Sequence, residues 1–114
     1  MAAANTLTTS PPHAVERSLL RLGADLRTAR LRRGLTIKMV ADKIGTGVRA
    51  VADAEKGKPT TAVVVYLALL WVYGLADDVD VLADPGRDAE GLALALSREP
   101  QRARRSDAGL DNDF

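Results

Sequence analysis

The segment LTIKMVADKIGTGVRAVADAEKG, residues 35–57, contains two short helical patterns joined by a turn that includes glycine. Thr36 stands just before the first pattern, where a threonine hydroxyl can accept a hydrogen bond from a backbone N–H of the first turn. Val40 and Ile44 lie four residues apart and therefore share one face of this helix. Gly45 follows them at the position where a left-handed glycine commonly ends a helix. We therefore expect a helix that begins after Thr36 and ends at Gly45.

The second pattern begins at Thr46-Gly47 and carries Val51 and Ala54 on its inner side. Ala41, in the first pattern, is small at a point where two steeply crossing helices must come close together. The segment therefore predicts a helix-turn-helix whose second helix, about residues 47–56, projects from the domain.

These patterns resemble the Cro/C1-type (XRE-like) helix-turn-helix family over about residues 22–82. The resemblance rests on Leu26, Arg30, Gly34, Leu35, Thr36, Val40, Ala41, Ile44, Gly45, Val51, Glu55 and Gly57. It implies an all-α fold, a compact bundle of five helices at residues 15–83, whose third helix enters the major groove of DNA. It also implies that double-stranded DNA is the partner.

The resemblance further implies a set of DNA-binding residues. Val48, Arg49 and Asp53 occupy the positions that usually face base edges. An arginine there can bind guanine in a bidentate manner, although it can also bind phosphate or remain in water. Asp53 can accept a hydrogen bond from cytosine, or it can pair with Lys56 or Arg49.

Phosphate contacts are expected from a second set of residues: Arg30, which matches the phosphate-contacting arginine of the family, with Thr36, Lys38, Gly47 and Lys58. Three positions depart from the family pattern because they lack its usual polar side chains. These positions are Ile37, Gly47 and Ala50.

Positive and negative charges separate along the chain. Between residues 14 and 60, eleven basic and five acidic side chains give a net charge of +6, whereas residues 61–114 carry −5. Positive charge around a helix-turn-helix is what the binding of DNA phosphates requires. The alternative is that these side chains only keep helix faces in water.

A longer helix is expected before the helix-turn-helix, from about Val15 to Arg33. Its apolar residues recur at steps of three and four: Leu19, Leu22, Leu26 and Ala29. Arg27, Arg30 and Arg33 are expected to lie away from this row. Residues 1–14 are small and polar and include two prolines, which predicts a disordered tail with no secretion signal.

The run TAVVVYLALLWVYGLA, residues 61–76, predicts an apolar helix that ends near Tyr73, and it is too short to span a bilayer. A helix that is apolar on every face must be covered on every face. We expect Tyr66, Leu70 and Tyr73 to be left in water in a monomer, which favours a homodimer or another partner. The alternative is a core helix that its own chain covers completely.

The remaining residues predict a short helix at about 77–82, a turn at 84–86 and a helix at about 88–97, although the alternation of leucine and alanine in that last stretch also suits a strand. Residues 84–105 resemble the C-terminal part of the HipB-like branch of the family, whose members are encoded beside HipA-like kinases. This resemblance implies a segment that contacts the dimer or a kinase partner. The basic group Arg102, Arg104 and Arg105 is an alternative DNA arm, and residues 106–114 are expected to be a disordered tail.

The chain has no cysteine and one histidine, and no catalytic or metal-binding constellation can be assembled from it. It therefore predicts a protein without enzymatic activity, metal or cofactor, in the cytoplasm. The function that fits best is a dimeric, autoregulatory DNA-binding regulator that reads an inverted repeat. The alternative is an antitoxin-like interaction module that binds a HipA-like kinase.

Overall fold

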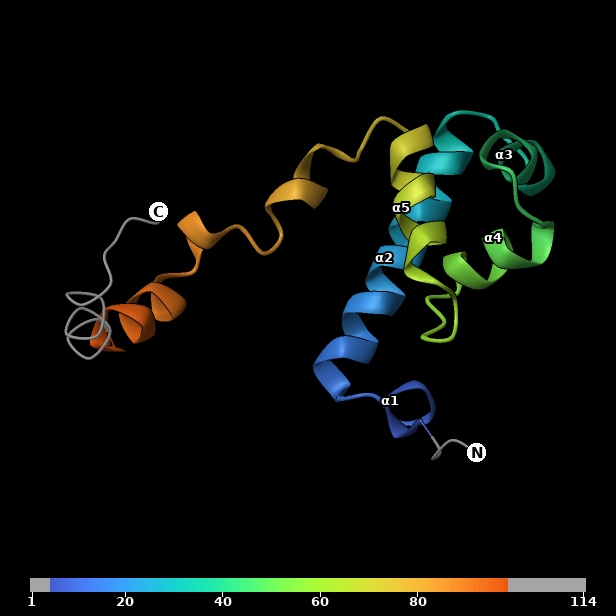
Figure 1. Ribbon diagram of the computed structural model, residues 1–114. Coiled ribbons are helices and arrows are strands. Elements are labelled where there is room, and N and C mark those ends of the chain that lie inside the picture. The colour runs from blue at the N-terminus through green and yellow to red at the C-terminus, as the bar shows by residue number, and fades with distance from the viewer. Residues whose placement is uncertain (1–4, 99–114) are drawn as a thin grey trace. The chain divides into compact units, whose positions relative to one another are not determined.

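The computed structural model describes residues 5–98, and every regular element within that range is helical (Figure 1). The elements are α1 (Thr6–Thr9), α2 (His13–Arg32), α3 (Ile37–Ile44), α4 (Val48–Glu55), α5 (Val63–Val72), the 3-10 helices η1 (Asp77–Val81) and η2 (Pro85–Arg87), and a helix at 89–98. The chain divides into two compact units, one through Val79 and one from Asp80. The first unit contains the all-α helix-turn-helix bundle that the sequence predicts. The helix expected at about 77–82 is the 3-10 helix η1, which begins in the first unit and ends in the second.

Both ends of α3 are capped by the residues that the sequence predicts. The hydroxyl of Thr36 accepts a hydrogen bond from the backbone N–H of Met39 at 3.1 Å, and the Met39 sulfur accepts one from the N–H of Thr36 at 3.4 Å. Gly45 ends α3 with a φ of 80°, and its N–H donates to the carbonyl of Ala41 at 2.9 Å. A side chain at Gly45 would strain this left-handed conformation, so the prediction of a glycine stop is confirmed.

Helix α2 meets α4 at two glycines. A β-carbon added at Gly23 would lie 2.6 Å from the carbonyl oxygen of Ala54, and one added at Gly57 would lie 2.5 Å from the carbonyl oxygen of Leu19. Real atoms do not approach so closely, so only glycine permits this packing of backbone on backbone. The contact fixes the position of the last turn of α4 on α2.

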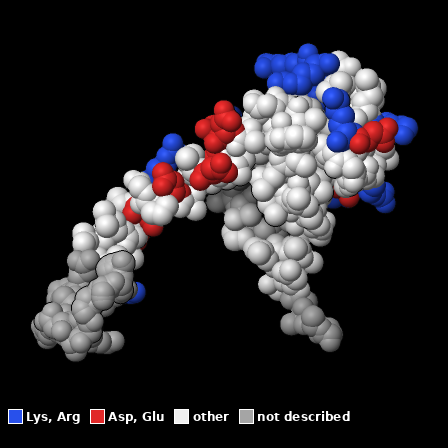
Figure 2. All heavy atoms as spheres, turned by 45° about the horizontal axis from the view of Figure 1, so that its top comes forward, with Lys and Arg blue, Asp and Glu red and all other residues white. Residues whose placement is uncertain are grey.

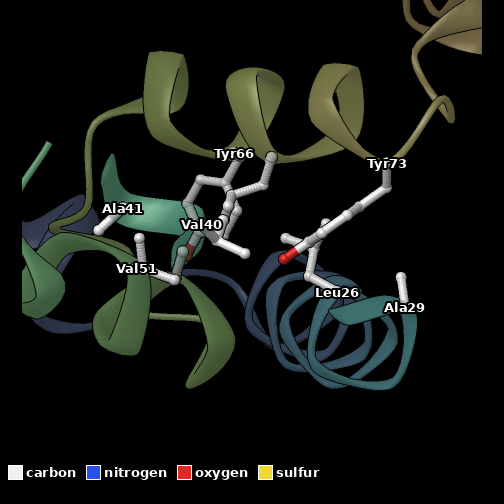
Figure 3. Close-up of a cluster of buried hydrophobic side chains, with 9 residues drawn as sticks. Leu26, Ala29, Val40, Ala41, Val51, Tyr66 and Tyr73 are labelled. Atoms are coloured by element: carbon white, nitrogen blue, oxygen red, sulfur yellow. The ribbon is translucent and has the colours of Figure 1, made fainter. Parts of the chain in front are cut away.

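The core lies where α2, α3 and α4 meet α5 (Figure 3). Its largest fully buried side chains are Leu26, Val40, Val51 and Leu69. Ala41 is also buried, as its small size predicts. Leu26, Val40, Val51 and Leu69 come from α2, α3, α4 and α5 respectively, so the core joins these four helices.

The prediction that Tyr66 and Tyr73 face water is wrong. Both are only 4% exposed, and they point from α5 toward the other helices of the core (Figure 3), while Leu70 is half-buried. The error arose because α5 is apolar on every side, so its periodicity does not indicate which face is the inner one. The exposed residues of α5 include Val64 and Trp71 instead.

The N-terminal region is more regular than the sequence predicts. Asn5 caps the single turn α1, with its side-chain oxygen accepting a hydrogen bond from Leu7, and α2 begins already at His13. The predicted tail at residues 1–14 therefore contains helical residues. Residues 1–4 lie outside the described range.

In the second unit, the leucine-rich stretch is a helix and not a strand. Asp88 precedes it, and a carboxylate oxygen of Asp88 accepts a hydrogen bond from the N–H of Gly91 at 2.9 Å, as a helix cap does. Leu92, Leu94 and Leu96 are each more than half exposed. Residues 99–105, with the basic group predicted as an arm, and the predicted tail at 106–114 lie outside the described residues.

Candidate nucleic-acid interface

Helix α4 has one buried face and one exposed face. Val51 and Ala54 are completely buried, whereas Val48, Arg49 and Lys56 are exposed. Arg49 and Lys56 are seven residues apart, which is two turns, so they lie in one row on the outer face. The helix therefore presents two cations along an edge that takes no part in the core.

The N-terminus of α4 is open. Gly47 is the N-cap residue, in an extended conformation with a φ of −83°, and it has no side chain to accept a hydrogen bond from the first turn. Thr46, just before it, donates its backbone N–H to the carbonyl of Ala41 at 2.9 Å. Backbone N–H groups at the start of a helix can bind a phosphate oxygen, which is the role predicted for Gly47.

Asp53 lies on the flank of α4 and is paired. Its carboxylate is 3.2 Å from the ammonium of Lys58, and its backbone carbonyl accepts a hydrogen bond from the N–H of Lys58 at 3.2 Å. The Tyr66 hydroxyl donates to the carbonyl of Lys58 at 2.8 Å and so holds the same loop against α5. The sequence suggested Lys56 or Arg49 as the partner of Asp53, whereas the structure pairs Asp53 with Lys58. Its carboxylate partly neutralises the lysine predicted to bind phosphate.

Thr36 and Lys38 lie at the start of α3, and both are exposed. The Thr36 hydroxyl accepts a hydrogen bond in capping the helix, but its own proton remains available to donate. The Lys38 ammonium is 3.3 Å from the carboxylate of Asp42, with both side chains at least two-thirds exposed. A pair so exposed is weak, so a phosphate can compete for the lysine.

Arg30 is not on the surface, and its predicted role as a phosphate contact is corrected. Only 9% of its side chain is exposed, and the guanidinium makes two hydrogen bonds to the carboxylate of Glu55, at 2.6 and 3.0 Å, and a third to the carbonyl of Leu35 at 2.9 Å. The hydrogen bond to Glu55 raises the pKa of Arg30 above its ordinary value, although burial acts in the opposite direction. This pair connects α2 to the last turn of α4 and to the loop before α3. Its role is to position α4.

The side chain of Arg33, at the C-cap of α2, also makes its hydrogen bonds within the domain. Its guanidinium donates to the carbonyls of Ala29 and Tyr73, each at 2.9 Å, and lies 5.4 Å from the centre of the Tyr73 ring. It therefore ties the end of α2 to the end of α5. The expectation that three arginines of α2 share an outward side holds for Arg27, which is exposed, but not for Arg30.

Two exposed cations near α4 were absent from the predicted site. Lys43 lies in the last turn of α3, and Lys56 is the C-cap of α4. The seven-residue spacing of Arg49 and Lys56 was the signal that could have found the second. Figure 2 shows Lys and Arg side chains along the upper and right-hand edges of the first unit, with acidic side chains among those on the right.

The two short helices α3 and α4, joined by the turn at Gly45 and held from behind by the Arg30–Glu55 ion pair, have the arrangement of the helix-turn-helix class. Residues 21–83, more than half of the chain, match the model of the helix-turn-helix domain family, and the chain belongs to this family. The match agrees with the Cro/C1-type resemblance of the sequence. The family consists of DNA-binding regulatory domains and is not a family of enzymes.

Comparisons with curated proteins and with solved structures gave no match. Among the described residues, no helix combines the length and the apolarity needed to cross a membrane.

Proposed function

We propose that this protein is a transcriptional regulator that binds an inverted repeat in DNA as a homodimer and controls its own gene. The observation that supports this most directly is the division of α4 into a face locked to the core and an outer row formed by Arg49 and Lys56. A recognition helix must be held rigidly while its base-facing side chains remain accessible. In a symmetric dimer, the two copies of α4 enter successive major grooves about 34–36 Å apart.

Within this interface we assign two kinds of contact. Arg49 reads a guanine, and Val48 touches a neighbouring thymine methyl group. Thr36, Lys38, Gly47 and Lys58 bind phosphates and set the register of the helix on the duplex. Asp53 is held by Lys58, so its part in base contact is secondary.

The test is binding of the full chain to the DNA upstream of its own gene, measured by fluorescence anisotropy at several salt concentrations. Each phosphate contact releases counterions, so log K should fall linearly with log salt, with a slope of about −0.9 for each contact. Unrelated DNA of the same length is the control. Equal affinity for both DNAs would contradict sequence-specific regulation.

A second candidate function is an antitoxin-like module that holds a HipA-like kinase. It is supported by the helix at 89–98, where Leu92, Leu94 and Leu96 are all exposed. Truncation after Leu82 should abolish capture of a kinase encoded by the neighbouring gene and leave the salt slope of DNA binding nearly unchanged. A loss of two or more units of that slope would instead assign the C-terminal segment to DNA binding.

A further inference from the structure

Met39 is the third residue of α3, the position from which a glutamate or glutamine commonly returns a hydrogen bond to the backbone of the N-cap residue. Here the Met39 sulfur takes that role and accepts the N–H of Thr36 at 3.4 Å. A thioether is a weak acceptor. This half of the capping box is therefore weaker than the other half, in which the Thr36 hydroxyl accepts the N–H of Met39 at 3.1 Å.

The donor in this weak hydrogen bond is polarised. The carbonyl of Leu35 belongs to the same peptide unit as the N–H of Thr36, and it accepts a hydrogen bond from the buried guanidinium of Arg30 at 2.9 Å. A hydrogen bond to the carbonyl of a peptide strengthens the hydrogen bond that its N–H can donate. The peptide between Leu35 and Thr36 thus presents a strong donor to a poorly matched acceptor.

The Met39 side chain is accessible to solutes, since the residue is 48% exposed. The chain has no cysteine, and its only other methionine is Met1. Thiols and thioethers are the side chains that peroxides oxidise, and no thiol competes here. Mild peroxide should therefore react with methionine in this chain, and Met39 is the methionine that takes part in the fold.

We propose that Met39 is a reversible oxidation site, whose sulfoxide strengthens the cap of α3 and weakens phosphate binding at this end of the helix. The sulfur attacks one oxygen of hydrogen peroxide, the O–O bond breaks, and the sulfur is oxidised by two electrons to the sulfoxide. The other oxygen leaves as hydroxide and takes the proton of the transferred hydroxyl, so the second product is water. Methionine sulfoxide reductases restore the thioether.

The sulfoxide oxygen supplies the acceptor that the thioether lacks. It carries a partial negative charge, as the side-chain oxygen of glutamine does, and it extends from an atom that already lies 3.4 Å from the Thr36 nitrogen. An oxygen acceptor at the N-terminus of a helix stabilises the helix. Because nearly half of Met39 is exposed, the added oxygen disturbs little packing. In a buried methionine the same reaction would disrupt the core.

The same oxygen changes the environment of the phosphate contacts. This step rests on the proposed function, in which Thr36 and Lys38 bind phosphates. The first N–H groups of a helix attract anions, and a partial negative charge fixed beside them competes with a DNA phosphate. Phosphate contacts carry no sequence information. Oxidation should therefore weaken binding to all DNA sequences alike.

The first test needs no DNA. The full chain is treated with hydrogen peroxide, and cleavage after Lys38 and Lys43 then releases residues 39–43 as one peptide for mass spectrometry. This peptide should gain one oxygen, and the midpoint of thermal unfolding should rise by about 2–6 °C, as a better helix cap implies. Treatment with methionine sulfoxide reductase should reverse both changes. An unoxidised peptide, or a lower midpoint after oxidation, would overturn the proposal.

Two substitutions serve as matched variants. Met39→Leu removes the sulfur at similar volume and keeps Met1 and Trp71, so its midpoint should not respond to peroxide. An equal response of this variant would assign the effect to another side chain and overturn the proposal. Met39→Gln places the usual amide acceptor at the same position permanently. Its midpoint should match that of the oxidised chain without any peroxide, and a midpoint below that of the untreated chain would contradict the proposed cap.

The second test measures fluorescence anisotropy on the upstream DNA and on unrelated DNA. The oxidised chain and Met39→Gln should bind both DNAs about 2- to 10-fold more weakly than the untreated chain, the factor that corresponds to one hydrogen bond. Unchanged affinity, or a loss confined to the upstream DNA, would contradict competition for a phosphate. Equal binding of the untreated chain to both DNAs would refute the proposed function instead, while the response to oxidation remains measurable on either DNA.

Discussion

Helices α4 and α5 lie side by side in the first unit, but their sequences determine their orientation to different degrees. Helix α4 mixes apolar and charged residues, and its inner row of Val51 and Ala54 leaves only one way to place it on the core. Helix α5 is apolar on every side, so several rotations would bury comparable area. The structure places Tyr66 and Tyr73 inward and Trp71 outward. An amphipathic helix thus reveals its functional face in its sequence, whereas a uniformly apolar helix reveals its outer face only after it has packed.

The largest expected effect concerns the buried ion pair between Arg30 and Glu55, behind α4. Replacing Glu55 with Ala leaves Arg30 charged and buried without its partner, which should lower the free energy of unfolding by about 3–5 kcal/mol in urea denaturation. Asp25→Ala, which breaks the exposed pair with Arg21, is the control and should cost well under 1 kcal/mol. If both variants had similar stability, the orientation of α4 would not depend on this pair.

The next prediction contrasts the two faces of α5. Leu69→Ala should destabilise the fold by about 2–5 kcal/mol, because Leu69 is completely buried and its loss leaves a cavity. Trp71→Ser should leave the thermal stability of the monomer nearly unchanged, since its side chain is largely in water. Thermal unfolding of both variants at low protein concentration measures the contrast. A large loss for Trp71→Ser would assign the outer face of α5 to the core.

The third prediction separates base reading from phosphate binding on the outer side of α4. Arg49→Ala should cost roughly 1–3 kcal/mol on the operator, much less on unrelated DNA, and should relax the preference for one guanine in each half-site. Lys38→Ala should weaken binding to all DNA sequences similarly and reduce the salt slope by about one. Anisotropy titrations on both DNAs distinguish the two. A uniform loss for Arg49→Ala would make that arginine a phosphate contact.

The smallest expected effects are changes in folding stability of opposite sign when each of the two buried tyrosines of the α5 region, Tyr66 and Tyr73, is replaced by Phe. The Tyr66 hydroxyl donates to the carbonyl of Lys58, so Tyr66→Phe should destabilise the fold by about 0.5–1.5 kcal/mol. The Tyr73 hydroxyl is buried and has no hydrogen-bond partner among the described residues, so Tyr73→Phe should be neutral or stabilising by about 1 kcal/mol. Urea denaturation of the two variants provides the measurement. A loss of stability for Tyr73→Phe would indicate a partner for that hydroxyl.

Burial also raises the pKa of both tyrosines above their ordinary value of about 10. Above that pH the unfolded chain loses phenolic protons that the folded chain retains. The stability that these two groups contribute is therefore present below about pH 10 and should decline as the pH rises beyond it.

The sequence predicts local features of the fold well, because each depends on residues only a few positions apart. The cap at Thr36, the stop at Gly45 and the inner residues Val40 and Val51 all belong to this class. Gly23 was not recognised, because its role depends on the backbone of Ala54, far along the chain.

Arg30 shows why part of the candidate site could not be predicted. It lies four residues after Leu26 and therefore shares the inner row of α2, but arginine is seldom buried without a partner. That partner, Glu55, is four residues after Val51 on the inner row of α4. Two opposite charges on two inner rows are a signal of pairing, although only the packed structure shows that the rows meet.

The backbone contact of Gly23 and Gly57 has a consequence for changing DNA specificity. Helix α4 is held by main-chain atoms and by residues of its inner row, so Val48, Arg49 and Lys56 contribute little to its position. These three exposed side chains can then be exchanged without refolding the domain. New operator sequences are therefore accessible through a few substitutions in α4, and a small library randomised at these positions should yield regulators that retain the same stability and recognise different DNA.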